Sequence, residues 1–331
     1  MATLHIIGNG FDIHHGIASL YSDFREYAWE HSGSDGYWLG QLETCYPTKN
    51  KKNGELELWC DLEYALGNID FQNAFDESTE DIELEEDHEM RFQAQMEDAP
   101  KYHLEMMFEA FHGIFEEWVN QIDIDAQPVV LPHFDRNGMF LSFNYTETLE
   151  TLYRIPKAQI NYIHGRRNCN QRLVVGHINN LNGNDFLSED PMIYEYEAYD
   201  NIAEVVNEQQ KNISEIISDN AKYWSSLTNI DKIVIYGHSL SDIDLDYFVE
   251  IAKHVTPDVQ WFFSISCDFL LLLCFGRLLV QRQRKEATQI FGLRGSWSYS
   301  RHCFYTFVIL SIRLLGCLSN AQFISSSGRV L

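Results

Sequence analysis

Six short apolar segments, each followed at once by glycine or polar residues, constrain the fold of this chain most strongly. They are Leu4–Ile7, Met139–Phe143, Ile160–Ile163, Leu173–Val175, Lys232–Tyr236 and Val259–Phe263. Short, mostly apolar runs of this kind are typical of strands buried on both faces of a sheet, and the long connections between them suit crossovers between parallel strands. The sequence therefore predicts an α/β fold with a mostly parallel, Rossmann-like sheet.

The longest connection, about residues 30–130, separates the first two apolar segments. Within it, Tyr102–Ile122 has apolar residues at helical spacing, whereas residues 76–98 hold 11 acidic residues and one basic residue, a composition typical of a solvated helix face or a flexible loop. We therefore expect a large helical insertion between the first and second core strands. Further helices are predicted at Ile13–Tyr27, Glu55–Leu66, Glu147–Tyr153 and 243–253, and a loop at Trp38–Lys52.

Charge and cysteine content argue against several classes of protein. A net charge of −25 disfavours a general affinity for nucleic acid or anionic membranes. The seven cysteines form no C-x-x-C pair, and no H-E-x-x-H motif occurs, so we expect neither a disulfide framework nor a metal cofactor. The first residues enter a predicted strand without a signal-peptide pattern, which favours a cytoplasmic protein.

A glycine turn follows the first predicted strand. Gly8-Asn9-Gly10 joins that strand to a predicted helix, and such a turn directs backbone N–H groups toward a phosphate. The third glycine of the dinucleotide-binding fingerprint is absent, because Ile13 stands in its place. Asp12 either belongs to the same site or caps the helix.

Polar residues also follow the later predicted strands. They are Asn144, His164, His177, His238, Ser239, Asp242 and Asp244. Because the carboxyl ends of parallel strands meet at one edge of a sheet, we expect these residues to converge with the glycine turn. Local roles are the alternative: a turn for Asn144, a hydrogen-bonded histidine at a strand end for His164, and helix caps for Thr146, Ser241 and Asp242.

The segment Gly237-His238-Ser239-Leu240-Ser241 invites comparison with the nucleophile elbow of α/β-hydrolases. Ser241 replaces the second glycine of that elbow, and only His254 and His302 follow as downstream histidines. A serine hydrolase that uses Ser239 is therefore the lesser alternative.

Taken together, these blocks resemble the AbiH family of bacteriophage abortive infection proteins. The resemblance covers about residues 3–265 and rests on segments that occur in the family's order: Ile6–Asp12, Tyr21–Phe24, Ser142–Thr146, Ile163–Gly165, Val175–His177 and Tyr236–Asp244. It implies one nucleotide-binding domain over residues 1–265 and a role in antiviral defence.

The same order of motifs is more distantly similar to sirtuin-like NAD-binding domains. That resemblance implies catalytic roles for Asn144, on the ribose or a water, and for His164 as a base. It also implies a nucleotide site at Gly8, Asn9, Gly10, Asp12, His238, Ser239, Asp242 and Asp244. The four zinc cysteines of deacetylating sirtuins are absent, so the implied reaction is hydrolysis of NAD at its nicotinamide N-glycosidic bond, with no metal.

A second class of function stays open at this point. The same site suits a nucleotide-binding sensor that signals through a partner without catalysis. Its partners are then a small nucleotide together with a second copy of the chain or a phage-derived trigger, whereas nucleic acid and membranes are not expected.

The last fifth of the chain has a different composition. Residues 267–331 hold 2 acidic and 8 basic residues and four of the seven cysteines, whereas residues 1–266 hold 47 acidic and 16 basic residues. The apolar runs Phe269–Val280 and Phe307–Leu318 are short for a membrane span, and each contains an arginine. We favour a translated shifted reading frame over a membrane anchor for residues 266–331. This tail also raises a third alternative for the function, namely that this copy of the protein is inactive.

Overall fold

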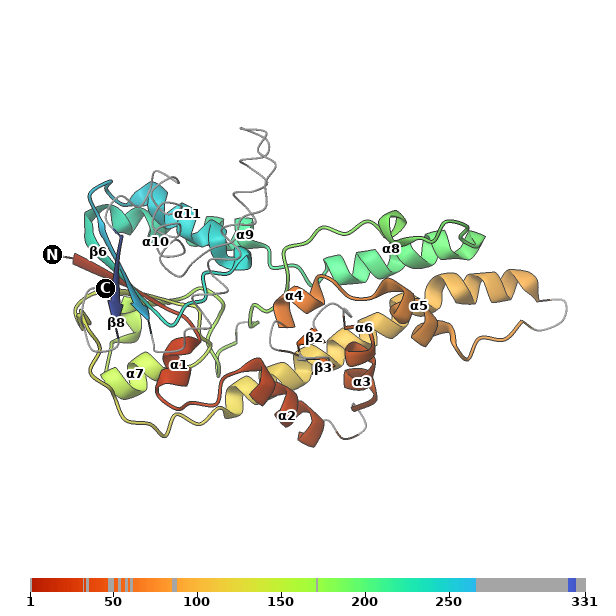
Figure 1. The fold of residues 1–331 in the computed structure, drawn as a ribbon, viewed down its shortest axis with the longest axis horizontal. Helices are drawn as coiled ribbons and strands as arrows, with labels where there is room; N and C mark the ends of the chain where they lie inside the picture. Colours follow the sequence, from red (N-terminus) through yellow and green to blue (C-terminus); the bar gives the residue numbers. More distant parts are fainter. Residues whose placement is uncertain are drawn as a thin grey trace. The chain divides into compact units, whose positions relative to one another are not determined.

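The sheet predicted from the sequence is present in the computed structural model (Figure 1). The structure describes residues 2–31, 33, 36–46, 51–52, 55–56, 59, 62–84, 88–170, 172–265 and 321–325. The strands are β1 (Ala2–Ile7), β4 (Met139–Ser142), β5 (Ile160–Tyr162), β6 (Ile230–Tyr236), β7 (Gln260–Ile265) and β8 (Ala321–Ser325). They lie in the order β5-β4-β1-β6-β7-β8 and every pair is parallel, which confirms the predicted α/β class.

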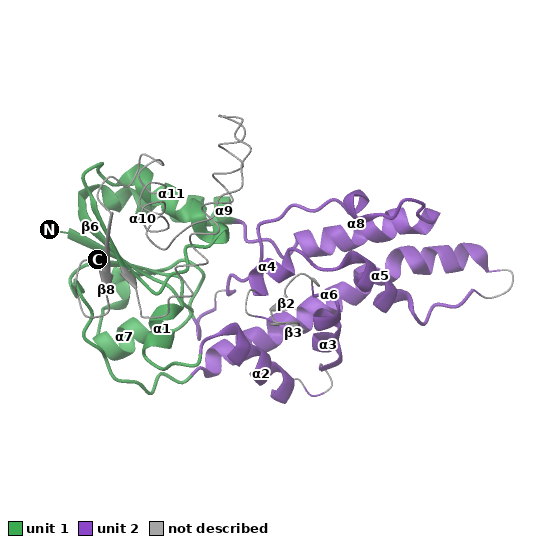
Figure 2. Cartoon of the chain, in the orientation of Figure 1, with its two compact units in different colours: residues 1–18, 123–166, 213–331 green, residues 19–122, 167–212 purple. Residues whose placement is uncertain are grey.

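The chain divides into two compact units (Figure 2). Unit 1 comprises residues 1–18, 123–166 and 213–331 and contains the sheet, whereas unit 2 comprises residues 19–122 and 167–212. The first part of unit 2 is the helical insertion expected between the first and second core strands. The second part, residues 167–212, was not expected there from the sequence.

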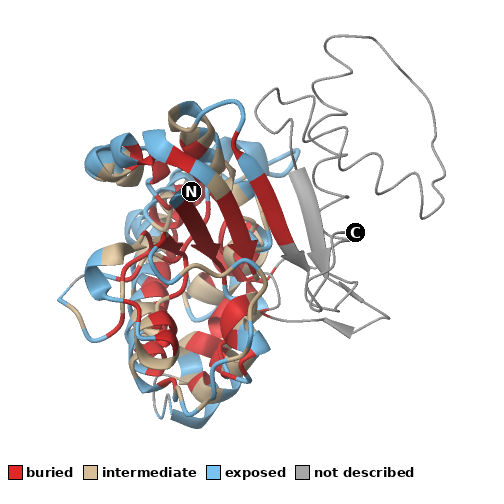
Figure 3. Ribbon diagram, turned by 90° about the vertical axis from the view of Figure 1, so that its left-hand side faces the viewer, coloured by how far each residue is buried: buried red, intermediate tan, exposed pale blue. Residues whose placement is uncertain are grey.

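Helices cover both faces of the sheet in unit 1. On one face α9 (Ile213–Asp219), α10 (Ala221–Ser225) and α11 (Leu245–His254) pack on Leu4 and Ile6. On the other face α1 (Gly10–His14) and α7 (Thr148–Tyr153) pack on Ile7. Successive side chains of a strand point to opposite faces, and every residue of β1 after Ala2 is buried, so this strand is covered on both sides (Figure 3).

Unit 2 is built from α-helices and one short hairpin. The helices are α2 (Tyr21–His31), α3 (Gly36–Thr44), α4 (Leu62–Leu66), α5 (Phe71–Thr79), α6 (Glu89–Gln121) and α8 (Ile193–Asn207), and the hairpin strands are β2 (Lys51–Lys52) and β3 (Glu55–Leu56). The apolar face of α6 buries Phe111 and Phe115 against Phe24 of α2. The periodicity of Tyr102–Ile122 thus marks the core of this unit.

Short 3-10 turns complete the connections. They are η2 (Lys157–Gln159), η3 (Gly183–Phe186), η4 (Ser226–Asn229) and η5 (Asp242–Asp244). The predicted helix 243–253 is therefore η5 followed directly by α11, and the predicted helix Glu147–Tyr153 begins one residue later as α7.

Two predictions near the start of the chain are wrong. The helix expected at Ile13–Tyr27 is split, because α1 ends at His14 and α2 begins only at Tyr21. The Asp12 carbonyl oxygen accepts hydrogen bonds from His15 and Ile17, and Gly16 has a φ of +77°, so the chain turns away from the helix axis. In unit 2 the predicted loop Trp38–Lys52 contains most of α3, since Leu39 and Leu42 are buried one turn apart.

Two further predictions fail in unit 2. Glu55–Leu66 was expected to be one helix, yet β3 occupies its start, and α4 is the helical part among the described residues of this segment. Leu173–Val175 is not a strand of the sheet. The residues that follow it form an isolated bridge in which His177 pairs with Gln210. Three apolar residues are too few to distinguish a strand from a buried loop.

None of the helices in the described part of the chain is long and apolar enough to cross a membrane. The predictions made for Phe269–Val280, Phe307–Leu318 and the rest of residues 266–331 lie outside the described residues, apart from the backbone of β8.

Candidate functional site

The carboxyl ends of four strands are in register at one edge of the sheet in unit 1. Ile7 at the end of β1 pairs with Ser142 of β4 on one side and with Tyr236 of β6 on the other, and Ser142 pairs in turn with Tyr162 of β5. The residues after these positions are therefore neighbours, as the strand pattern predicted for the turns at Gly8, Asn144, His164 and His238. Whether they bind or transform a ligand is a separate question, and their predicted roles stay predictions.

The glycine turn packs directly against the turn after β6. The Gly8 N–H group donates to the Tyr236 carbonyl oxygen at 2.9 Å, and the Gly10 N–H group donates to the Gly237 carbonyl oxygen at 2.8 Å. A Cβ atom on Gly10 would lie 2.8 Å from that Gly237 oxygen. Gly237 itself has a φ of +63°, and a Cβ atom there would lie 2.1 Å from the Phe11 nitrogen.

This contact gives the glycines a structural reason that the sequence did not reveal. β1 is the switch point of the sheet, where a doubly wound fold usually opens a crevice between neighbouring turns. Here the two turns touch and their N–H groups are engaged. A phosphate at Gly8 and Gly10 would have to share those N–H groups with the protein's own carbonyl oxygens.

Asp12 ties the glycine turn to the turn after β4. It is fully buried, and its Oδ2 accepts a hydrogen bond from the Thr146 hydroxyl, which also lies 3.1 Å from the Thr148 hydroxyl. The alternative local roles were wrong for these residues: Asn9 is the N-cap of α1 and Glu147 is the N-cap of α7. Asp12 therefore links two turns on the α1–α7 face of the sheet.

Asn144 has an unusual environment for a turn residue. It is only 6% exposed, and its backbone N–H donates to the Ser142 hydroxyl at 3.2 Å. Neither Oδ1 nor Nδ2 of its side chain has a hydrogen-bond partner among the described residues. An unsatisfied buried amide lowers stability by roughly 1–3 kcal/mol, and a bound water or ligand would recover that loss.

His164 and His238 face one carboxylate. Nε2 of His164 lies 3.6 Å from Oδ1 of Asp244, and Nε2 of His238 lies 3.6 Å from Oδ2 of the same group. All three side chains are at most about a tenth exposed. The carboxylate therefore acts on both imidazole rings in an environment with little water to screen it.

Aromatic side chains enclose this cluster on the α11 face of the sheet. The Phe143 ring centre lies 5.1 Å from that of His164 and 4.3 Å from that of His238, in edge-to-face geometry. Tyr247 packs on His164 and Phe248 packs on His238. Neither aromatic residue was predicted from the sequence, although two aromatic side chains in the first turn of the helix after Asp244 were a usable signal.

The remaining predicted residues lie nearer the surface. Asn9, Ser239 and Asp242 are exposed, whereas Asn144, His164 and Asp244 are buried. No hydrogen bond joins Ser239 to a histidine in the described part of the chain. His254 instead lies 3.0 Å from a Glu250 carboxylate oxygen, and His302 is outside the described residues. The hydrolase triad thus gains no support.

His177 does not follow a strand of the sheet as predicted, and it belongs to unit 2. Its Nε2 lies 2.7 Å from the Val206 carbonyl oxygen, and its Nδ1 accepts from the Asn179 N–H at 3.1 Å. Burial lowers the pKa of His177. A neutral ring with both nitrogens engaged is a structural histidine, held where α8 ends.

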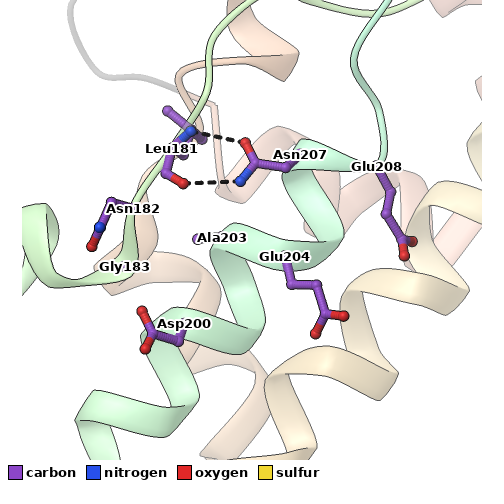
Figure 4. Close-up of a pocket in the computed structure, with 8 residues that line it drawn as sticks. All are labelled: Leu181, Asn182, Gly183, Asp200, Ala203, Glu204, Asn207 and Glu208. Atoms are coloured by element: carbon purple, nitrogen blue, oxygen red, sulfur yellow. Dashed lines mark hydrogen bonds between the residues drawn. The ribbon is translucent and has the colours of Figure 1, made fainter. Parts of the chain in front are cut away.

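Unit 2 has a surface depression of its own (Figure 4). The loop at Leu181 is fixed to α8 there, because Asn207 accepts from the Leu181 N–H at 2.8 Å and donates to its carbonyl oxygen at 2.9 Å. Asp200, Glu204 and Glu208 line the depression. Three carboxylates disfavour a phosphate, so this depression is a poor candidate for the nucleotide site predicted from the sequence. No group of three or more metal-ligating side chains occurs among the described residues.

Comparison with known proteins identifies one family. The family model described as "Bacteriophage abortive infection AbiH" matches residues 4–265, which include all the strand-end residues described above. No curated protein and no solved structure matches the chain.

Proposed function

Because the chain belongs to the AbiH family of bacteriophage abortive infection proteins, we propose that it serves this defence by binding and hydrolysing NAD in unit 1. The family fixes the biological role, whereas the reaction is our proposal. Loss of NAD would stop phage growth together with that of the host cell. The NAD part of the proposal starts from the distant likeness of the motif order to sirtuin-like domains.

One observation carries the choice of site. The buried Asn144 side chain lacks hydrogen-bond partners among the described residues and stands at the carboxyl edge of a parallel sheet, where α/β proteins bind ligands. An amide can donate to one ribose hydroxyl and accept from another, or it can hold a water. At the neighbouring strand end, after β5, His164 supplies a nitrogen base whose usual pKa lies near neutrality.

These groups suit cleavage of the N-glycosidic bond. As the bond between the ribose C1′ and nicotinamide breaks, its electron pair returns to the pyridinium ring, and positive charge develops on the ribose. Water attacks C1′, and its proton passes to His164 and then to solvent. The products are nicotinamide and ADP-ribose. Asp244 beside His164 favours the positive charge that the imidazole acquires.

The remaining predicted residues suit the rest of the nucleotide. The exposed side chains of Asn9 and Ser239 lie on the two touching turns and can donate to pyrophosphate or ribose oxygens, and Asp242 can accept from a ribose hydroxyl. Asn144 and His164 are 6% and 3% exposed, so the nicotinamide ribose reaches them only when the covering side chains move. This movement is a natural step for activation by a trigger.

The test is incubation of purified protein with NAD, with and without an extract of phage-infected cells, and chromatography of the products. We expect release of nicotinamide, with Asn144→Ala and His164→Ala each slowing it by at least about 100-fold. His14→Ala, which alters an exposed histidine on α1, is the matched control and should keep full activity. Intact NAD under every condition, or an unimpaired His164→Ala protein, contradicts the proposal.

The near-complete burial of Asn144 and His164 also favours a second candidate, a nucleotide sensor without turnover. Calorimetry distinguishes the two functions. A sensor binds NAD or ADP-ribose without releasing nicotinamide, and it keeps that affinity when His164 is replaced by alanine.

A further inference from the structure

We propose that Asp244 is a positioning residue that stabilises the protonated form of His164, while the turn at Leu240 keeps His238 neutral, so that His164 is the one member of the pair that gains and loses a proton. This inference rests on the proposed function, in which His164 is the base. It assigns to Asp244 a role different from the nucleotide contact expected from the sequence.

The first step concerns the proton on His238. Its Nδ1 accepts a hydrogen bond from the Leu240 N–H group at 2.9 Å. A nitrogen that accepts such a bond carries no proton, so the neutral ring holds its proton on Nε2, which faces Asp244. Protonation of both nitrogens would break the backbone hydrogen bond within this tight turn, where Leu240 has a φ of +53°.

The second step concerns the carboxylate. Asp244 is the N-cap residue of α11, a position at which aspartate usually accepts from the helix N–H groups. Its side chain makes no capping hydrogen bond and instead presents one oxygen to each histidine. Because a helix cap usually contributes about 1 kcal/mol, this orientation forgoes a stabilising contact in favour of the two rings.

The single negative charge of Asp244 is shared unequally between the two histidines. One carboxylate can neutralise one imidazolium, and His238 is held neutral by its turn. Asp244 therefore stabilises the charged form of His164 and orients the Nε2–H bond of that ring toward the carboxylate. Among the described residues, the titratable side chains that face the His164 ring include Asp244, at 3.6 Å, and Tyr247, whose ring centre lies 5.6 Å away.

Nuclear magnetic resonance of the full chain with ¹⁵N-labelled histidine tests the proposal directly. In the wild type we expect His238 to keep the Nε2–H tautomer throughout the accessible pH range, while His164 titrates. Asp244→Asn should lower the pKa of His164 by at least about one unit, equivalent to a tenfold change in its proton affinity. Asp246→Asn, which removes an exposed charge two residues further on, should leave that pKa unchanged.

The proposal is overturned if His238 titrates together with His164. It is also overturned if the pKa of His164 is the same in Asp244→Asn as in the wild type. The wild-type spectrum alone decides the tautomer, so the test does not depend on the variant folding. It also does not depend on turnover. If NAD stays intact while the histidines behave as described, the proposed reaction fails and the positioning role stands. If NAD is hydrolysed while His238 titrates, the proposed reaction stands and the positioning role of Asp244 fails.

Discussion

A buried histidine in the centre of the sheet makes the stability of unit 1 sensitive to mild acid. His5 lies in the middle of β1, fully buried, with its ring stacked on Phe140 and Tyr236. Its Nε2 lies 3.1 Å from both the carbonyl oxygen and the N–H nitrogen of Asp135. Burial removes water from the ring and lowers the pKa of His5 from 6.5 to about 4.

The size of the effect follows from this shift. Between pH 6.5 and pH 4 the unfolded chain binds a proton at His5 that the folded chain does not bind, so the free energy of unfolding falls as the pH is lowered. The contribution of the neutral His5 side chain to the free energy of unfolding is complete above pH 6.5 and is lost as the pH approaches 4. Lowering the pH from 7.5 to 5 should remove about 2 kcal/mol through His5 alone.

The assay compares the wild type with His5→Gln in urea at several pH values between 5 and 7.5. Pulsed hydrogen exchange of the β1 peptide reports unfolding of unit 1 apart from that of unit 2. Burial also lowers the pKa of His15, His103, His112, His133 and His177, so the wild type contains their contributions as well. The difference between the two proteins isolates His5.

We expect His5→Gln to be less stable than the wild type at pH 7.5 but to lose about 2 kcal/mol less on going to pH 5. His14→Gln, at an exposed position of α1, should follow the wild-type curve. Parallel loss of stability in the wild type and His5→Gln would refute the reasoning, because the acid sensitivity would then arise elsewhere.

Two more substitutions test packing and charge. Gly237→Ala should lower the free energy of unfolding by about 2–5 kcal/mol in urea, because it combines a left-handed backbone with a clash, whereas Gly113→Ala in α6 meets open space and should not destabilise the protein. Lys211→Met should lower it by about 3–5 kcal/mol, because the lysine nitrogen lies 2.6 Å from a Glu63 oxygen and its side chain is 1% exposed. Adding Glu63→Gln should restore part of that loss, and a purely additive double variant would show that the pair is not coupled.

Most of the strands were predictable because each carries a short, mostly apolar run that ends at glycine or polar residues, as buried parallel strands commonly do. β1, β4 and β6 lie where the runs at Leu4–Ile7, Met139–Phe143 and Lys232–Tyr236 predicted them. Leu173–Val175 was misassigned because such a short run is equally compatible with a buried loop. The split between α1 and α2 depends on the backbone at Gly16, whose left-handed conformation periodicity does not reveal.

The candidate site was predictable in position and only partly in detail. Strand ends in a parallel sheet must meet, so the convergence of Asn144, His164 and His238 followed from the order of the strands. The contact between Gly10 and Gly237 did not follow, because it depends on how closely two turns approach. Nor did the orientation of Asp244, since an aspartate at a helix start usually caps the helix.

The central claim is that water attacks C1′ of NAD at the Asn144–His164 site, and mass spectrometry of products formed in ¹⁸O-labelled water tests it most directly. Purified protein is incubated with NAD, with and without an extract of phage-infected cells. The proposal predicts one ¹⁸O atom in each ADP-ribose, formed in step with nicotinamide and abolished by His164→Ala. Unlabelled ADP-ribose, or NAD that stays intact under both conditions, would contradict it.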